Sequence, residues 1–219
     1  MLEPISPFGP KIGKSIISED LQKILLEIIA DPNLSSASNK LISYVKHEKT
    51  ITPKLFETGA ANQILDYIID YVNNIEPGIY QPILPLPRSA VTLQNAWVNI
   101  QREHEFHPLH DHRGVDLVCV IYPQINIKTK SPYETRDDRR REPGALILHY
   151  GHQLNYGIGI SEYKIDPVER EIYVFPADLN HYTLPIFGND LRVSISCNFT
   201  FSENVKRKLS EHIQRKFYQ

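Results

Sequence analysis

The sequence is poor in the residues that mark several specialised protein classes. Among its 219 residues there are two cysteines, one tryptophan and one methionine. Two cysteines cannot build a disulfide framework, and both Cys119 and Cys197 lie inside apolar runs. We therefore expect buried, reduced thiols and a cytoplasmic location. No apolar run approaches the ~20 residues that a membrane helix needs, and the segment Met1–Lys14 contains no apolar signal core.

The sequence also lacks an excess of charge of one sign. It has 24 lysines and arginines against 26 aspartates and glutamates, which gives a formal net charge of −2. A balance of this kind favours neither nucleic acid nor an anionic membrane as a partner. We therefore expect a small-molecule or peptidyl substrate. The sequence leaves the oligomeric state open, including that of a homodimer.

The first third of the chain predicts helices. Residues 1–17 are expected to form an irregular or extended lead. Ser18 then caps a helix whose apolar residues recur at helical spacing as far as Ile29. Residues 38–47 predict a weaker helix, and a third helix follows Gly59. These helices have the pattern of packing elements, because no ligand-type residues converge on them.

From Val91 onward the pattern is that of strands. Residues 91–101 and 192–201 both alternate, with one apolar and one polar face each. Shorter apolar strands are predicted over residues 117–122, 145–150, 171–175 and 182–187. Helices followed by many short strands indicate an α+β fold with a double-layered antiparallel core. We expect one domain over 1–219, made of a helical N-terminal part (1–77), a strand core (78–201) and a C-terminal helix (202–219).

The segment from Lys128 to Glu142 differs from the rest in composition. It contains the mixed-charge run Arg136–Arg141. Two interpretations stay open, a solvated hairpin loop or a mobile lid that recognises substrate at the mouth of a site.

Three histidines form a candidate metal site. His110 and His112 are two residues apart, so on a strand both side chains point to one face and can grip one ion. His181 follows a strand and a turn and is the candidate third ligand. Neutral imidazole is a common metal ligand, and three protein ligands leave positions open for catalysis. His107 is a candidate for a supporting role behind these ligands.

Arg192 is the candidate anion site. It lies eleven residues after His181, on a strand face that it shares with Ser194. A guanidinium binds a carboxylate through two parallel hydrogen bonds, and a hydroxyl adds a third. The alternative is an ion pair with a protein carboxylate such as Asp190 or Glu171. On the strand before the histidines, Trp97 and Asn99 share a face and are expected to line the same pocket. A cross-strand polar contact is the alternative for Asn99.

These residues together resemble the iron(II)- and 2-oxoglutarate-dependent dioxygenases, and in particular an uncharacterised branch found in marine bacteria and phages. The segments that carry the resemblance are Trp97–Asn99, His107–His112, Phe175–Pro176, His181 and Arg192–Asn198. It implies a double-stranded β-helix, also called a jelly roll, of cupin-like architecture, with the N-terminal helices packed on it.

The resemblance also implies the chemistry of the site. Fe(II) is expected at His110, His112 and His181, with 2-oxoglutarate as co-substrate and its far carboxylate on Arg192. Trp97, Asn99, Ser194 and Asn198 are the other expected co-substrate residues. The implied reaction is oxidative decarboxylation of 2-oxoglutarate to succinate and carbon dioxide, coupled to hydroxylation of a substrate that the sequence does not identify.

One departure from the family pattern concerns the second ligand. The larger superfamily has His-x-Asp or His-x-Glu at this point, whereas this sequence has His112 in the carboxylate position. Either three imidazoles hold the metal, or Asp111 enters through a bulge or turn. Three neutral ligands would leave the metal charge at +2 and alter its affinity and redox potential.

Two other functions remain compatible with the sequence. The first is a three-histidine metalloenzyme that does not use 2-oxoglutarate, for which Arg192 would have no purpose as a carboxylate anchor. The second is a non-catalytic binding or structural module that keeps the barrel, since a fold does not determine function.

Overall fold

Two antiparallel sheets face each other in the protein. The structure, a computed structural model, describes residues 2–5, 9–37, 43–129, 142–151 and 161–217. Within these residues the main sheet has the strand order β1-β2-β8-β5-β10-β4-β3 and the smaller sheet the order β7-β6-β9. The strands are β1 (Glu3–Ile5), β2 (Ile12–Ile16), β3 (His47–Thr50), β4 (Val91–Gln101), β5 (Leu117–Asn126), β6 (Leu146–His149), β7 (Glu162–Ile165), β8 (Glu171–Pro176), β9 (Asn180–Thr183) and β10 (Leu191–Phe201).

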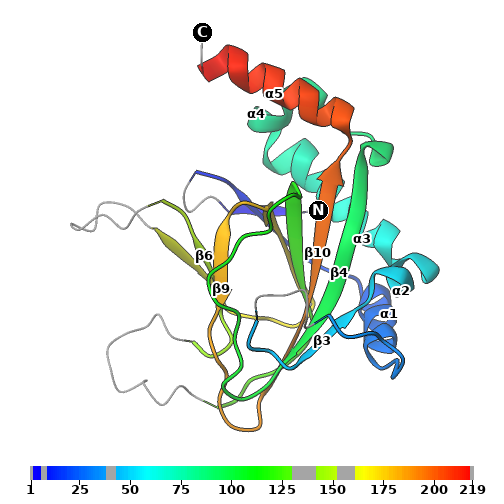
Figure 1. The fold of residues 1–219 in the computed structure, drawn as a ribbon, viewed down its shortest axis with the longest axis vertical. Helices are drawn as coiled ribbons and strands as arrows, with labels where there is room; N and C mark the ends of the chain where they lie inside the picture. Colours follow the sequence, from blue (N-terminus) through cyan, green and yellow to red (C-terminus); the bar gives the residue numbers. More distant parts are fainter. Residues whose placement is uncertain (1, 6–8, 38–42, 130–141, 152–160, 218–219) are drawn as a thin grey trace.

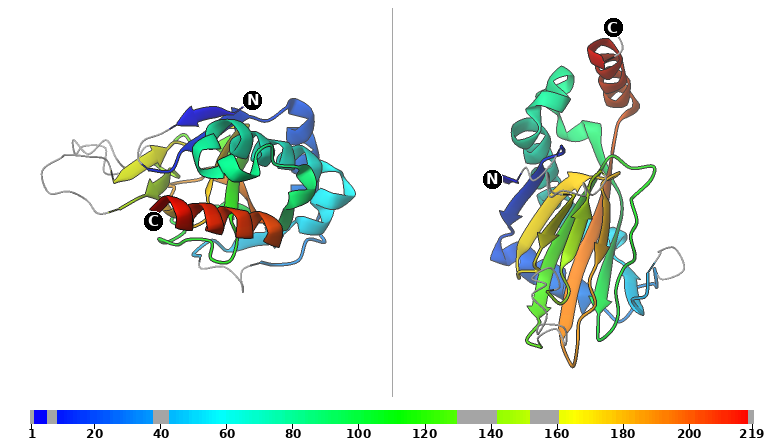
Figure 2. Two further views of the ribbon diagram at one scale, coloured as in Figure 1. Left: turned by 90° about the horizontal axis from the view of Figure 1, so that it is seen from above. Right: turned by 90° about the vertical axis from the view of Figure 1, so that its left-hand side faces the viewer.

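Helices cover the face of the main sheet that points away from the smaller sheet. In Figure 1 helices α1 to α3 lie on one side of β4 and β10, and β6 and β9 lie on the other side. Figure 2 shows helix α5 at one end of the molecule, beside the helical segment that precedes β4. The helices are α1 (Glu19–Ile29), α2 (Thr52–Glu57), α3 (Ala60–Asp70) with a π-helical turn (Tyr71–Ile75), α4 (Pro77–Tyr80), two 3₁₀ turns (Gln81–Ile83, Arg88–Ala90) and α5 (Glu203–Phe217).

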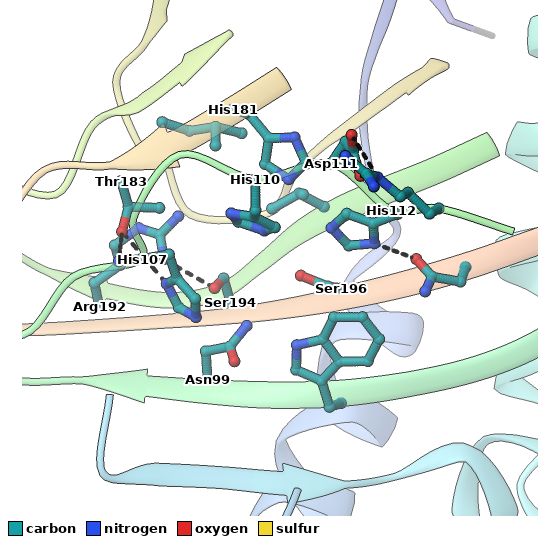
Figure 3. A pocket seen from close by; sticks show the side chains of 15 residues that line it. Asn99, His107, His110, Asp111, His112, His181, Thr183, Arg192, Ser194 and Ser196 are labelled. Atoms are coloured by element: carbon teal, nitrogen blue, oxygen red, sulfur yellow. Dashed lines mark hydrogen bonds and ion pairs between the residues drawn. The ribbon is translucent and has the colours of Figure 1, made fainter. Parts of the chain in front are cut away.

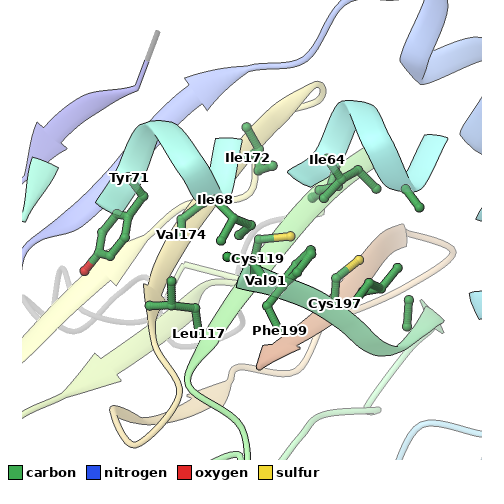
Figure 4. Close-up of a cluster of buried hydrophobic side chains, with 14 of the residues drawn as sticks. Ile64, Ile68, Tyr71, Val91, Leu117, Cys119, Ile172, Val174, Cys197 and Phe199 are labelled. Atoms are coloured by element: carbon green, nitrogen blue, oxygen red, sulfur yellow. The ribbon is translucent and has the colours of Figure 1, made fainter. Parts of the chain in front are cut away.

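The larger hydrophobic core lies between these helices and the main sheet. Ile64 and Ile68 of α3 belong to the same buried cluster as Cys119, Val174 and Cys197 of the central strands (Figure 4). The two cysteines are buried and free, as the sequence predicts, and they face each other on neighbouring strands β5 and β10. This core joins the N-terminal helices to the strand region.

A second hydrophobic cluster fills the space between the two sheets. It contains Val118, Val120 and Tyr122 of β5 together with Leu146 and Leu148 of β6. Strand β5 is therefore covered on both faces, by helices on one and by the smaller sheet on the other. A strand that is buried on both faces has no need for polar alternation, which explains its continuous apolar sequence.

Strands β4 and β10 carry the alternation that the sequence predicts. The apolar residues of β10 from Val193 to Phe201 point to the helices and belong to the larger core. The pairing between β4 and β10 shifts register at Gln94, which lies between Leu93 and Asn95. This β-bulge places both Leu93 and Ala96 on the helical side, although they are three residues apart. The polar faces of both strands point toward the smaller sheet.

In the N-terminal part the helix that begins after Ser18 is confirmed, and one other prediction is wrong. Ser18 caps α1 by accepting the backbone N–H of Leu21 at 3.1 Å, and the helix ends before Asp31-Pro32. The lead, expected to be irregular or extended, is extended in part, since it contains strands β1 and β2 of the main sheet. The prediction of a weak helix over 38–47 is wrong for residues 43–47, the part of this range that the structure describes. Residues 43–46 are irregular and His47 begins β3, whereas residues 38–42 lie outside the described residues.

Three further predictions concern the second half of the chain. The C-terminal helix is confirmed as α5. The strand expected over 182–187 ends at Thr183, because Pro185 has no N–H to donate to a ladder. Most of the charged segment 128–142, namely residues 130–141, lies outside the described residues, so neither interpretation of it is tested. Among the described residues, no helix has the length and apolar character to cross a membrane.

The α+β architecture predicted from the sequence is confirmed. Helices pack on one face of a large antiparallel sheet, and a smaller antiparallel sheet packs on the other. The division into residues 1–77, 78–201 and 202–219 stays a prediction, and β1, β2 and β3 show that the first part also contributes strands to the main sheet.

Candidate functional site

A cavity of about 240 Å³ lies between the two sheets. Its floor is the polar face of β4 and β10, and its roof is the segment 107–113 together with β9 (Figure 3). Val120 and Leu146 supply apolar wall, and the remaining lining is polar. The polar lining residues are Trp97, Asn99, His107, His110, Asp111, His112, Arg113, His181, Thr183, Arg192, Ser194, Ser196 and Asn198.

His110, His112 and His181 converge in this cavity. One ring nitrogen from each lies within 4.8 Å of those of the other two. His110 and His181 are brought together by the backbone, because the His110 N–H donates to the His181 carbonyl at 3.0 Å and the reverse bond measures 2.8 Å. The segment around His110 is thus joined to β9 by an isolated antiparallel bridge, and His112 follows on the same segment.

The hydrogen bonds of the three rings leave one nitrogen of each free for a ligand. Nδ1 of His110 lies 2.7 Å from the Pro108 carbonyl, and Nδ1 of His181 lies 2.8 Å from the Leu179 carbonyl. Nδ1 of His112 lies 2.6 Å from Oδ1 of Asn198. A carbonyl oxygen only accepts, so in each ring Nδ1 is the donor and Nε2 keeps its lone pair. This arrangement is the one that metal-binding histidines use.

Burial favours the neutral form of all three imidazoles. It lowers the pKa of His112 to about 4, a shift that the hydrogen bond to Asn198 only partly opposes. Burial likewise lowers the pKa of His110, and it holds the pKa of His181 well below its usual value. The proximity of the other histidines adds to the lowering at His181. The three rings are therefore neutral at pH 7, as metal binding requires.

Asp111 lies outside the histidine cluster. Its carboxylate faces the side chain of Arg113, with 3.3 Å between Oδ1 and Nε (Figure 3). Among the described residues, the only group of three or more histidine, cysteine or acidic side chains with converging ligand atoms consists of the three histidines. The chain thus places three imidazoles, and not Asp111, at the centre of the cavity.

Arg192 lines the cavity and is only 1% exposed. Its Nη1 donates to Ser194 Oγ at 2.9 Å and to Gln101 Oε1 at 3.3 Å, and its guanidinium lies 5.1 Å from the ring centroid of Tyr122. Nε has no hydrogen-bond partner among the described residues. The described residues also supply no carboxylate to Arg192, which leaves a buried cation without a counter-charge.

The two acids proposed as alternative partners of Arg192 are occupied elsewhere. Asp190 accepts the backbone N–H groups of Lys128 and Thr129 at 2.9 and 2.7 Å. Glu171 pairs with Lys14 at 2.6 Å. A buried guanidinium that has a free donor and no anionic partner among the described residues has the chemistry to bind a small anion.

The other predicted residues also line the cavity, in different surroundings. Asn99 is 3% exposed, and its Oδ1 has no hydrogen-bond partner in the described part of the chain. The Trp97 ring stacks on that of His112 with 5.6 Å between centroids. Asn198, which the resemblance implies as a co-substrate residue, instead holds His112.

Sequence reasoning missed Thr183 and Glu48. Thr183 follows His181 by two residues on β9, so both side chains lie on one face of the strand. This spacing could have predicted that Thr183 lines the cavity. Glu48 is a buried acid whose Oε1 lies 3.1 Å from Nε2 of His107. No local pattern marked it, because its strand β3 reads as polar sequence.

A family model and solved structures match this arrangement. Residues 95–198 match the model of a family described as "Putative 2OG-Fe(II) oxygenase". The strand core of this chain is thus similar to the 2OG-Fe(II) oxygenases. The matched region contains all three histidines and Arg192. The enzyme class is that of an oxidoreductase, and the cofactors of the class are Fe(II) and 2-oxoglutarate. The family resemblance predicted from the sequence is thereby confirmed.

Solved structures of the same fold have low sequence identity to this chain. A prolyl-4-hydroxylase from Pseudomonas putida has 15% identity and a TM-score of 0.52, with 87% of this chain and 92% of that chain covered. A prolyl hydroxylase from Trichoplax adhaerens, in complex with a hypoxia inducible factor peptide fragment, has 15% identity and a TM-score of 0.52, with coverages of 89% and 86%.

HygX from Streptomyces hygroscopicus, with nickel, 2-oxoglutarate and hygromycin B bound, has 8% identity and a TM-score of 0.55, with coverages of 88% and 83%. A search of curated protein sequences gave no match. At these identities the structures show the fold alone, and they confirm the predicted double-stranded β-helix.

Proposed function

We propose that the protein is a 2-oxoglutarate-dependent hydroxylase whose Fe(II) is held by His110, His112 and His181. The observation that carries the proposal is a combination in one cavity. Three neutral imidazoles have Nε2 atoms without a partner in the described part of the chain, and a buried guanidinium has no counter-charge there. A dicarboxylate that also chelates a metal through its other end satisfies both groups at once. When bound, Fe(II) supplies the reductive activation of dioxygen.

The chain's own residues do four things in this proposal. The imidazoles bind the metal through Nε2, and their Nδ1 bonds fix the ring orientations. Arg192 and Ser194 bind the far carboxylate of 2-oxoglutarate through charge-assisted hydrogen bonds. Val120 and Leu146 exclude water from part of the cavity. Trp97, Asn99 and Ser196 line the cavity and are available to orient the bound molecules.

The overall reaction balances as a four-electron reduction of dioxygen. Substrate R–H, 2-oxoglutarate and O₂ give R–OH, succinate and CO₂, with one oxygen atom in the hydroxyl group and the other in succinate. The substrate remains a small molecule or a peptidyl side chain. The complexes of HygX with hygromycin B and of the Trichoplax enzyme with a peptide support both classes on this fold.

Release of succinate and CO₂ in the presence of Fe(II), ascorbate and 2-oxoglutarate tests the proposal. We expect slow uncoupled turnover by the wild-type protein and none by His181→Ala, which loses a ligand from the cluster. Metal binding without any 2-oxoglutarate affinity would replace the proposal by a three-histidine metalloenzyme. Absence of metal binding would favour a non-catalytic module.

A further inference from the structure

A buried acid and a buried imidazole meet beside the metal cluster, and neither has a role in the proposed reaction. Glu48 on β3 is 1% exposed and His107 is 7% exposed. Glu48 Oε1 lies 3.1 Å from His107 Nε2, and Glu48 Oε2 has no hydrogen-bond partner among the described residues. His107 also lines the cavity. A buried carboxylate with one unpartnered oxygen is costly to keep.

His107 belongs to the two-stranded ribbon that carries two of the metal ligands. Its backbone N–H donates to Thr183 Oγ1 at 2.8 Å, and its carbonyl accepts the Thr183 N–H at 3.0 Å. Three residues further along, the same ribbon pairs His110 with His181. The position of His107 therefore determines where this ribbon, and with it His110 and His181, lies above the main sheet.

The ribbon is tied to the main sheet by side chains on both sides of the metal cluster. On one side the His112 ring is held by Asn198 of β10 at 2.6 Å. On the other side the His107 ring is held by Glu48 of β3 at 3.1 Å. Asn198 and Glu48 come from different strands of one sheet. Figure 3 shows His107 and His112 on opposite sides of His110.

We propose that Glu48 and His107 are positioning residues for the metal site. The pair works as a clamp that fixes the distance between the His110–His181 ribbon and the main sheet. This inference rests on the proposed function, because it assigns the clamp to the histidine cluster. Buried ion pairs are weak stabilisers, and their replacement by apolar residues is often neutral or stabilising. Stability alone therefore gives no reason to keep Glu48 buried.

The experiment measures Co(II) binding and folding separately in the full-length protein. The main variant is Glu48→Met with His107→Leu, which replaces the pair by apolar residues of similar size. We expect its melting temperature to equal or exceed that of the wild type. We expect its dissociation constant for Co(II) to rise by about tenfold or more, the lower bound for losing a supporting contact of metal ligands. The visible Co(II) spectrum should shift, because the ligand geometry changes.

A rescue variant and a matched control sharpen the result. Glu48→Gln keeps an oxygen that accepts the His107 Nε2–H, so it should bind Co(II) within about threefold of the wild type. Glu76→Met removes another buried carboxylate, which accepts the Lys11 N–H at 2.6 Å and is not part of the cavity lining. This control should lower the melting temperature and leave Co(II) affinity unchanged.

Each outcome decides the matter. Wild-type affinity and spectrum in the double variant would show that the pair is only structural, and a failure of Glu48→Gln to rescue would overturn the hydrogen-bonded clamp. If the double variant does not fold, Thr183→Val removes the hydroxyl that holds His107. Its unchanged Co(II) affinity would equally refute the clamp. If the wild type binds no Co(II), or His181→Ala binds it normally, the histidine site itself is wrong and the clamp falls with it.

Discussion

Replacing Arg192 by methionine separates an anion anchor from a structural ion pair. Methionine keeps the length of the apolar stem and removes the guanidinium. In the wild type the buried guanidinium has three hydroxyl or amide partners, Ser194, Gln101 and Tyr122, and no carboxylate among the described residues. If 2-oxoglutarate supplies the missing carboxylate, the variant loses one partner of a buried charge pair.

The expected loss of affinity is large enough to measure directly. Truncating one partner of a buried charge pair costs about 2–4 kcal/mol. At 1.4 kcal/mol per decade this corresponds to roughly 30- to 1000-fold weaker binding of 2-oxoglutarate. Metal affinity should stay, because the three imidazoles are untouched. The melting temperature should change little, because the lost hydrogen bonds are offset by relief of an uncompensated buried charge.

Calorimetric titration of 2-oxoglutarate into the Co(II)-loaded protein, with a melting curve of each variant, checks these expectations. Arg170→Met is the matched control. Arg170 holds the Ile17 carbonyl at 3.0 Å and is not a cavity residue, so its loss should reduce stability and not affinity. Unchanged 2-oxoglutarate affinity in Arg192→Met would refute the anchor. So would a parallel loss of Co(II) binding, since the change would then act on the whole cavity.

Three further predictions concern the surroundings of these residues. Asn198→Ala removes the acceptor of the His112 ring, and Co(II) titration should show about 10- to 100-fold weaker binding, whereas unchanged affinity would show that the ring needs no such support. Gly144 has φ +72°, and a Cβ there would lie 3.2 Å from Arg192 Cδ and closer still to other side chains. Gly144→Ala should therefore lower both the melting temperature and 2-oxoglutarate affinity. Wild-type values of both in this variant would contradict the close packing at Gly144. Burial lowers the pKa of His112 to about 4 and that of His181 well below 6.5. Below pH 6.5 these two imidazoles therefore stay neutral in the folded protein, whereas the same side chains bind protons in the unfolded chain. Stability should fall as the pH drops from 6.5 toward 4, and a flat melting temperature over this range would refute the neutral assignment.

The strands that hold the candidate site could be predicted because their two faces meet different surroundings. On β10 the residues facing the helices are apolar and those facing the cavity are polar, so the period of two is visible in the sequence. The helix that begins after Ser18 could also be predicted, since its N-terminal cap and its apolar stripe both indicate a helix over the same residues. The histidine spacing predicted a cluster, and the structure brings the three side chains together.

Other elements exist only because of pairing between distant segments. Strand β3 is the sequence His-Glu-Lys-Thr, which has no strand pattern of its own and forms at the edge of the sheet by pairing with β4. Strands β1 and β2 are similarly short and pair with each other and with β8. Glu48 was therefore out of reach of sequence reasoning, because its meeting with His107 depends on an edge strand that local patterns do not reveal.

The charge of the cavity connects the cluster of three imidazoles with the proposed anion anchor. His112 occupies the position where the superfamily has a carboxylate, and Asp111, the only acid that lines the cavity among the described residues, faces Arg113 instead. A divalent metal held by three neutral rings keeps its full charge, and Arg192 adds a second buried positive charge in the same small space. The protein offers no described counter-ion to either. One ligand with two negative groups can stabilise two positive centres in the same cavity together, and 2-oxoglutarate is a dicarboxylate of this kind. The absence of the carboxylate ligand therefore strengthens the electrostatic case for an anionic co-substrate, because the co-substrate must now supply the negative charge that the missing ligand would have provided.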